Sequence, residues 1–115
     1  MSTKVLFRKY KETDDPILSR FAGDIDALFP YDAPTDDPDE CGSYAHIGQH
    51  GEADYEYVLS LTVPAKPEEY KGLHDELVNL CGYDDLEALV RTPNKHTAWS
   101  VRATKIRNYR KGEKE

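Results

Sequence analysis

The chain has 115 residues, of which 38% are hydrophobic and 32% charged, and it carries a net charge of −7. This length suits one domain with one modest core, and eight Tyr, three Phe and one Trp set the composition apart from that of a disordered chain. No apolar run approaches the roughly 20 residues of a membrane span, and the first residues lack the apolar stretch of a signal peptide. We therefore expect a cytoplasmic protein with no membrane segment, in which Cys41 and Cys81 stay as thiols.

The charge is divided unevenly along the chain. Residues 1–90 carry twenty acidic side chains and seven basic ones, whereas residues 91–115 carry two acidic and eight basic ones. The sequence therefore predicts an acidic body with a basic C-terminal segment. The basic residues of that segment are Arg91, Lys95, Arg102, Lys105, Arg107, Arg110, Lys111 and Lys114.

The N-terminal third of the chain predicts two strands and a loop. Apolar and polar residues alternate over residues 4–10, a pattern typical of a half-buried strand. A similar alternation over residues 24–29 predicts a second strand, which Pro30 ends, and we expect the two strands to pair as a hairpin. Two prolines and five acidic residues make residues 31–42 an exposed loop.

The middle of the chain predicts a strand, a turn and a helix. Residues 41–47 are compatible with a third short strand, and the glycine-flanked residues 48–51 are typical of a tight turn. Residues 53–62 place apolar side chains at helical spacing, although their β-branched and aromatic content also permits a strand. A helix is the interpretation that we favour for this segment.

The C-terminal part predicts two helices and one strand. Pro67 at a first helical position, acidic residues in the first turn and an apolar stripe predict a helix over residues 67–81, which Gly82 ends. Alternation over residues 85–91 predicts a strand. Residues 94–109 predict an amphipathic helix with a basic opposite face, whose apolar stripe comprises Trp99, Ala103, Ile106 and Tyr109.

Together these elements predict an α+β fold. We expect a small, mainly antiparallel sheet with the main helix packed on one face and a basic C-terminal helix after the last strand. The strands of this sheet are expected near residues 4–10, 24–29, 42–47 and 85–91. We expect one domain over residues 1–111 and a frayed tail over residues 112–115.

The densest group of reactive side chains lies between residues 41 and 54. His46 and His50 are four residues apart, which places them on one face of a strand or a helix. One interpretation is a ligand-binding surface, and another is that these side chains hydrogen-bond to backbone around the glycine turn. The segment lacks a Cys-x-x-Cys pair and its glycines disfavour a helical two-histidine zinc motif, so we predict no metal ion and no cofactor. The predicted ligand-binding residues are Tyr44, His46, Gln49, His50, Glu52 and Asp54.

Two charged segments each carry competing hypotheses. The acidic loop either binds a hard cation or a basic partner, or is simply a solvated loop. The basic helix offers Arg102, Lys105 and Arg110 to phosphates, but the acidic body would repel a polyanion, so nucleic acid is not the expected partner. A simpler hypothesis places this helix against the acidic surface of its own chain, or of a second copy in a homodimer.

Several motifs resemble those of a family of small uncharacterised proteins of bacteria and their phages. The resemblance covers residues 4–96, and its most specific part is the stretch Ser-Tyr-x-His-Ile-Gly-Gln-His that begins at Ser43. It implies a bacterial or phage origin and no particular activity. The other motifs are Val5-Leu-Phe-Arg-Lys-Tyr, Asp26-Ala-Leu-Phe-Pro, Pro67-Glu-Glu-Tyr and Gly82-Tyr-Asp-Asp-Leu.

The leading functional prediction is a non-enzymatic acidic binding module. It would engage a protein or a small ligand through residues 44–54 and its acidic surface. The alternative is a small metal-dependent or thiol hydrolase that uses His46, His50, Glu52 and Cys41, since an imidazole next to a thiol can activate it as a nucleophile. Both hypotheses require these side chains to meet at an accessible hollow.

Overall fold

The computed structural model describes residues 3–45 and 49–113 and contains a six-stranded sheet. Its strands are β1 (Thr3–Tyr10), β2 (Ile25–Phe29), β3 (Glu40–Ala45), β4 (Gln49–Asp54), β5 (Thr62–Pro64) and β6 (Leu86–Ala88). The order is β4-β3-β2-β1-β5, and β6 pairs with the N-terminal half of β1. The β1–β6 pairing is parallel and the other pairings are antiparallel, which confirms the mainly antiparallel sheet and the β1–β2 hairpin.

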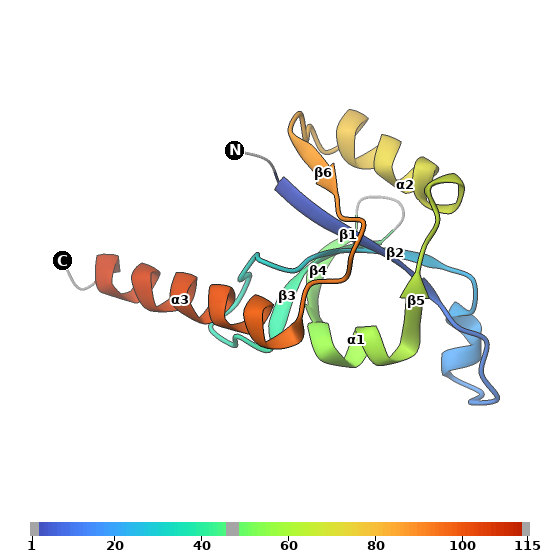
Figure 1. Ribbon diagram of the computed structural model, residues 1–115, viewed down its shortest axis with the longest axis horizontal. Coiled ribbons are helices and arrows are strands. Elements are labelled where there is room, and N and C mark those ends of the chain that lie inside the picture. Colours follow the sequence, from blue (N-terminus) through green and yellow to red (C-terminus); the bar gives the residue numbers. More distant parts are fainter. Residues whose placement is uncertain (1–2, 46–48, 114–115) are drawn as a thin grey trace.

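Helices cover both faces of this sheet (Figure 1). The main helix, α2 (Pro67–Asn79), lies on one face, whereas α1 (Tyr55–Leu61) and α3 (Lys95–Glu113) lie on the other. A short 3-10 helix, η1 (Leu18–Phe21), sits in the connection between β1 and β2. The predicted α+β class is thus confirmed, and the fold adds a second helical layer that the sequence did not indicate.

The core is divided into two clusters by the sheet. On the α2 face the buried residues are Val5, Phe7, Ala27, Phe29, Tyr44, Leu73 and Leu77. On the opposite face they are Leu6, Leu28, Cys41, Tyr55, Val58 and Ala98, the last three coming from α1 and α3. Each face therefore buries its own apolar set, as a sheet between two helical layers requires.

The central strand β1 differs from the half-buried strand that was predicted. Its residues Val5, Leu6, Phe7 and Arg8 are all buried. The reason is its position: β2 pairs with one side, β5 and β6 pair with the other, and helices cover both faces. A strand enclosed in this way loses the polar face that alternation indicates.

Local signals set the positions of α1 and α2. Asp54 caps α1 by accepting a hydrogen bond from the backbone N–H of Tyr57 at 3.0 Å, and the helix confirms the interpretation favoured for residues 53–62. Pro67 begins α2 as predicted, and Glu69 accepts a hydrogen bond from the Lys66 N–H at 2.9 Å. The sequence did not indicate β5, which follows α1 directly.

Several predicted boundaries were wrong. Residues 49–51 belong to β4 and not to a tight turn, since Gly51 pairs with Ser43 in the ladder. The helix predicted to reach residue 81 ends at residue 79, with Gly82 in a left-handed conformation (φ +78°) just beyond it. β6 covers only three residues of the predicted 85–91, and α3 continues to residue 113.

The two cysteines are free thiols, as predicted. They lie on opposite faces of the sheet, because Cys41 belongs to the cluster under α1 and α3 whereas Cys81 packs against the cluster under α2. Within residues 3–45 and 49–113, no helix combines the length and the apolar character that a bilayer crossing needs.

Candidate functional site: the β3–β4 hairpin and its outer edge

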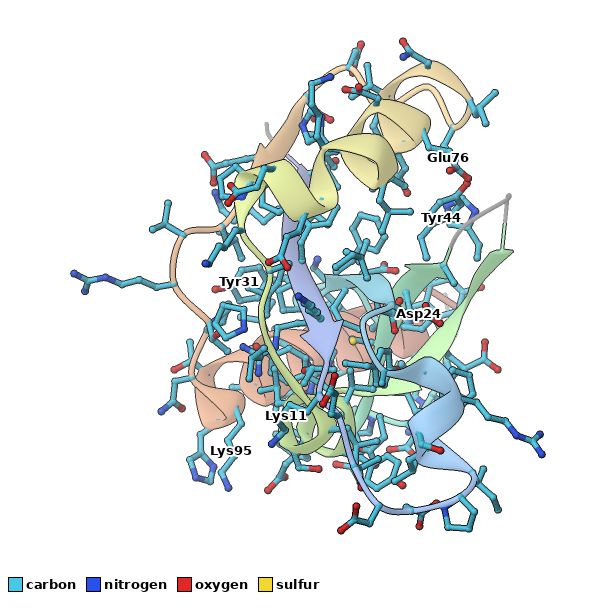
Figure 2. The ribbon with its side chains drawn as sticks, turned by 90° about the vertical axis from the view of Figure 1, so that its right-hand side faces the viewer. Lys11, Asp24, Tyr31, Tyr44, Glu76 and Lys95 are labelled. Atoms are coloured by element: carbon cyan, nitrogen blue, oxygen red, sulfur yellow. The ribbon has the colours of Figure 1, made fainter. Side chains whose placement is uncertain are left out.

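The predicted site lies on the β3–β4 hairpin. Tyr44 is a buried residue of this site. Tyr44 pairs directly with His50, so the two side chains lie on the same face of the sheet. The Tyr44 ring is 0% exposed, and its hydroxyl donates a hydrogen bond to the Glu76 carboxylate of α2. Figure 2 shows these two side chains pointing toward each other. Tyr44 thus stabilises the packing of α2 on the sheet and is not open to a ligand.

His50 and Glu52 are the members of the predicted site whose side chains face solvent together. Both are exposed, and both lie on the α2 side of β4 because they are two residues apart in a strand. The His50 ring meets the Tyr44 ring edge to face, with 4.7 Å between the ring centroids. The buried tyrosine therefore supports the exposed imidazole from below.

The remaining predicted residues have separate positions. Asp54 is exposed, but its carboxylate caps α1 and lies at the far end of β4. Gln49 begins β4, opposite Ala45. His46 lies outside the described residues. Of the six predicted ligand-binding residues, His50 and Glu52 thus form an exposed adjacent pair, and no hollow of the predicted kind gathers the described ones.

The backbone of β4 forms one margin of the sheet, since the strand order ends there among the described residues. The Tyr55 N–H donates to the Asp39 carbonyl at 3.1 Å. This bond identifies which opposite pairs of the β3–β4 ladder are the hydrogen-bonded ones. Hydrogen-bonded pairs alternate along an antiparallel ladder, so Gly51 and Ala53 also bond to β3. The N–H and C=O groups of the alternate residues, including His50 and Glu52, therefore point away from the sheet (β4 lies at the right-hand margin in Figure 2).

Cys41 does not share a site with His50. Its side chain is 0% exposed and lies in the cluster under α1 and α3, whereas His50 lies on the α2 face. Burial raises the pKa of the Cys41 thiol to about 12. A thiol held neutral in this way is not a nucleophile at neutral pH. The structure therefore does not bring together the Cys41–His50 pair that the hydrolase hypothesis uses.

The metal version of that hypothesis finds no ligand set in the part of the chain that the structure describes. No group of three His, Cys, Asp or Glu side chains there lies close enough to hold a metal ion. Glu52 and His50 alone supply two donors, fewer than the three or four that zinc sites use. His46, the third donor of the hypothesis, lies outside the described residues.

A second polar centre, which sequence reasoning missed, surrounds Arg102 in α3. This side chain is 2% exposed and donates from Nε to the Pro38 carbonyl at 2.8 Å and from Nη1 to the Pro30 carbonyl at 2.7 Å. Its guanidinium also lies 5.1 Å from the centre of the Tyr55 ring. The acidic loop predicted over residues 31–42 covers residues 30–39 in the structure, because β3 begins at Glu40. Arg102 thereby fixes both ends of this loop to α3.

Further contacts extend this attachment along α3. The Trp99 indole N–H donates to the Asp39 carboxylate at 2.8 Å, and the Lys105 ammonium donates to the Tyr31 carbonyl at 2.6 Å. Arg110 forms an ion pair of 3.6 Å with an acid of the same loop. The prediction that the basic helix lies against the acidic surface of its own chain is confirmed. Arg102, Lys105 and Arg110, the residues offered to nucleic acid, already have partners within the chain.

The predicted apolar stripe of α3 was only partly right, since Ile106 is buried and Ala103 half-buried but Trp99 and Tyr109 are exposed. The buried side chains of this helix are Ala98, Arg102 and Ile106, at intervals of four residues, whereas Trp99 is 43% exposed and Tyr109 is exposed. Helical periodicity of apolar residues missed this face because its central member is an arginine. The Ala-x-x-x-Arg-x-x-x-Ile spacing was the sequence signal for this buried face. The sequence did not indicate that loop carbonyls would accept hydrogen bonds from the arginine.

A cavity of about 300 Å³ lies where α1, α3 and the acidic loop meet. Its acidic groups have partners within the chain: Glu56 pairs with Lys95 at 2.9 Å, Asp39 accepts a hydrogen bond from Trp99, and Asp54 caps α1. No buried side-chain N or O atom among the described residues lacks a hydrogen-bond partner. The cavity is therefore a junction between elements and presents no group that calls for a ligand.

Comparisons with protein-family models, with curated proteins and with solved structures find no match to this chain. The resemblance drawn from the sequence motifs therefore stays a prediction. Among the described residues, the two polar centres that bear on function are the outer edge of β4 and the Arg102 attachment of α3.

Proposed function

We propose that this protein is a non-enzymatic binding module that takes an extended segment of a protein partner along the outer edge of β4. The observation that carries the proposal is the outward direction of the His50 and Glu52 backbone groups at the end of the strand order. An extended peptide that adds to an open sheet edge uses such groups for its main-chain hydrogen bonds.

The contacts around β4 support a strand edge that is already rigid before a partner binds. Tyr44, its hydrogen bond to Glu76 and the β3–β4 ladder hold the strand from the inner side. Gly51 and Glu52 at its middle are exposed, so a second strand meets no bulky apolar side chain there. A rigid edge costs little ordering on binding, which favours affinity.

The side chains beside this edge favour a basic partner. Glu52 and Asp54 are both exposed, and Asp54 pairs across the ladder with Glu40, so three carboxylates lie along the β3–β4 hairpin. Arg102, Lys105 and Arg110 of α3 do not neutralise them, because these three side chains bind the acidic loop. A partner segment from another protein is therefore extended and carries Lys or Arg at alternate positions. We place this role in the cytoplasm, because its reducing conditions keep cysteines such as Cys41 and Cys81 as free thiols.

A short peptide of alternating valine and lysine is the probe that tests the proposal. Titrated into the isotopically labelled protein, it should shift amide NMR signals of residues 49–54, and its affinity should fall as salt rises. Glu52→Pro should abolish binding, since proline removes an outward N–H that β3 does not use. Glu52→Gln is the matched control: it keeps the N–H and removes only the charge, so binding should weaken and persist.

Two results would count against the proposal. One is binding of the peptide whose shifts map to the junction of α1 and α3 or to the face of α2, with residues 49–54 unmoved. The other is undiminished binding by Glu52→Pro, which would show that the outward groups of β4 take no part.

A further inference from the structure

The sequence of β4 is self-complementary across its outer edge. If two copies of β4 run antiparallel, outward residues must face outward residues, so an even-numbered residue of one copy faces an even-numbered residue of the other. When Gly51 faces Gly51 of the second copy, His50 faces Glu52 and Glu52 faces His50. Each of these pairs then exchanges both of its N–H···O=C hydrogen bonds, and each brings an imidazole beside a carboxylate.

The other symmetric registers are less favourable. A register centred on Glu52 sets His50 opposite Asp54 but also places the two Glu52 carboxylates opposite each other, and one centred on Ala53 places Glu52 opposite Asp54. Like charges directly opposite in a sheet are destabilising, and opposite charges are stabilising. A register centred on His50 aligns two imidazoles and gains no acid–base pair. Charge therefore selects the register centred on Gly51, where the absence of a side chain also leaves room on the two-fold axis.

Resting on the proposed function, we infer that one occupant of the β4 edge is the β4 strand of a second copy, in a two-fold homodimer centred on Gly51. The two sheets become one continuous sheet, and the interface is isologous, as a two-fold axis requires. This dimer differs from the one predicted through the C-terminal helix, whose cations bind the acidic loop of their own chain. The strand is short, so the contact area is small and the dimer is in rapid exchange with the monomer.

The test is sedimentation equilibrium of the full chain and two single charge variants, His50→Glu and Glu52→Lys. The first variant places two carboxylates opposite each other in both pairs, and the second places an ammonium opposite each imidazole. Each should raise the dimer dissociation constant about tenfold.

Two combinations of these substitutions should restore association. In an equimolar mixture of the two single variants, the carboxylate introduced at position 50 of one chain faces the ammonium introduced at position 52 of the other. The mixture should therefore associate as a heterodimer. The double variant should dimerise at least as tightly as the natural chain, since each pair again joins a carboxylate to a basic side chain.

Controls separate this inference from others. Glu68→Lys changes the net charge as Glu52→Lys does, but on an exposed position of α2, and should leave the dissociation constant unchanged. A dimer that all these variants leave intact would overturn the inference, because its contact would lie elsewhere. A chain that stays monomeric while the valine–lysine peptide still binds β4 would overturn the homodimer and leave the proposed function standing. A chain that neither dimerises nor binds the valine–lysine peptide would overturn the proposed function as well.

Discussion

The two charged regions of this chain are used in opposite ways. The basic helix α3 is the more conspicuous in the sequence, but Arg102, Lys105 and Arg110 bind groups of the acidic loop within the same chain. The β4 strand carries fewer charges in the sequence, yet its polar side chains and outward backbone groups face solvent. A concentration of charge in a sequence therefore indicates an interaction, but it does not say whether the partner is another molecule or the chain itself.

The largest effect should come from breaking the Arg102 attachment. Arg102→Ala leaves the Pro30 and Pro38 carbonyls without their donors, and we expect the free energy of unfolding to fall by about 3–4 kcal/mol. Urea denaturation measures this loss. Arg107→Ala, on the exposed side of the same helix, should change stability by less than about 0.5 kcal/mol. Equal effects of the two substitutions would show that Arg102 contributes no more than a surface cation.

A slightly smaller effect concerns the half-buried carboxyl of Asp26. Burial raises its pKa from 3.8 to about 6, although the Tyr10 hydroxyl hydrogen-bonds to it at 3.3 Å. The folded state therefore holds the Asp26 proton more tightly than the unfolded state does. The protonated carboxyl contributes its full share to stability below about pH 4, and this share is lost as pH rises through 6. Asp26→Asn, which stays neutral, should gain up to about 3 kcal/mol of stability relative to the natural chain between pH 4 and pH 8.

Denaturation of both proteins across this pH range measures the difference. The stability of Asp26→Asn relative to the natural chain should rise with pH and level off above pH 7. A difference that does not vary with pH would show that Asp26 titrates in the folded state as it does in the unfolded chain.

The smallest of these effects separates the buried and exposed members of the predicted site. Tyr44→Phe removes the hydroxyl that binds the Glu76 carboxylate, so the free energy of unfolding should fall by about 1.5–3 kcal/mol. His50→Ala, an exposed position on the paired strand, should lower it by less than about 1 kcal/mol. Thermal or urea unfolding checks both. The assignment of Tyr44 to structure and of His50 to binding would be reversed if His50→Ala proved the more destabilising.

The elements with strong local signals were predictable from the sequence. Pro67, Glu69 and the apolar stripe fixed α2 near its observed position, and the first two strands paired as expected. Their signals are local because caps and periodicity act within a few residues. β5 was missed because it has three residues, and its position depends on pairing with β1.

The candidate site was only partly predictable, for a physical reason. Period-two alternation indicates that Tyr44 and His50 have defined faces, but it does not indicate which strand lies at the margin of the sheet. That order depends on the packing of α2 against one face and of α1 and α3 against the other. The same packing buries Tyr44 and Cys41 and leaves His50 and Glu52 exposed. It also places Arg102 at the centre of the buried face of α3.

Amide hydrogen exchange of β4 decides whether its outer edge is open, because it reports each backbone N–H separately. In dilute protein, the amides of Gly51 and Ala53 should be protected by β3, whereas those of His50 and Glu52 should exchange rapidly. Saturation with the valine–lysine peptide should slow His50 and Glu52 selectively. Protection of His50 and Glu52 already in the dilute protein, or no change on saturation, would contradict an open binding edge.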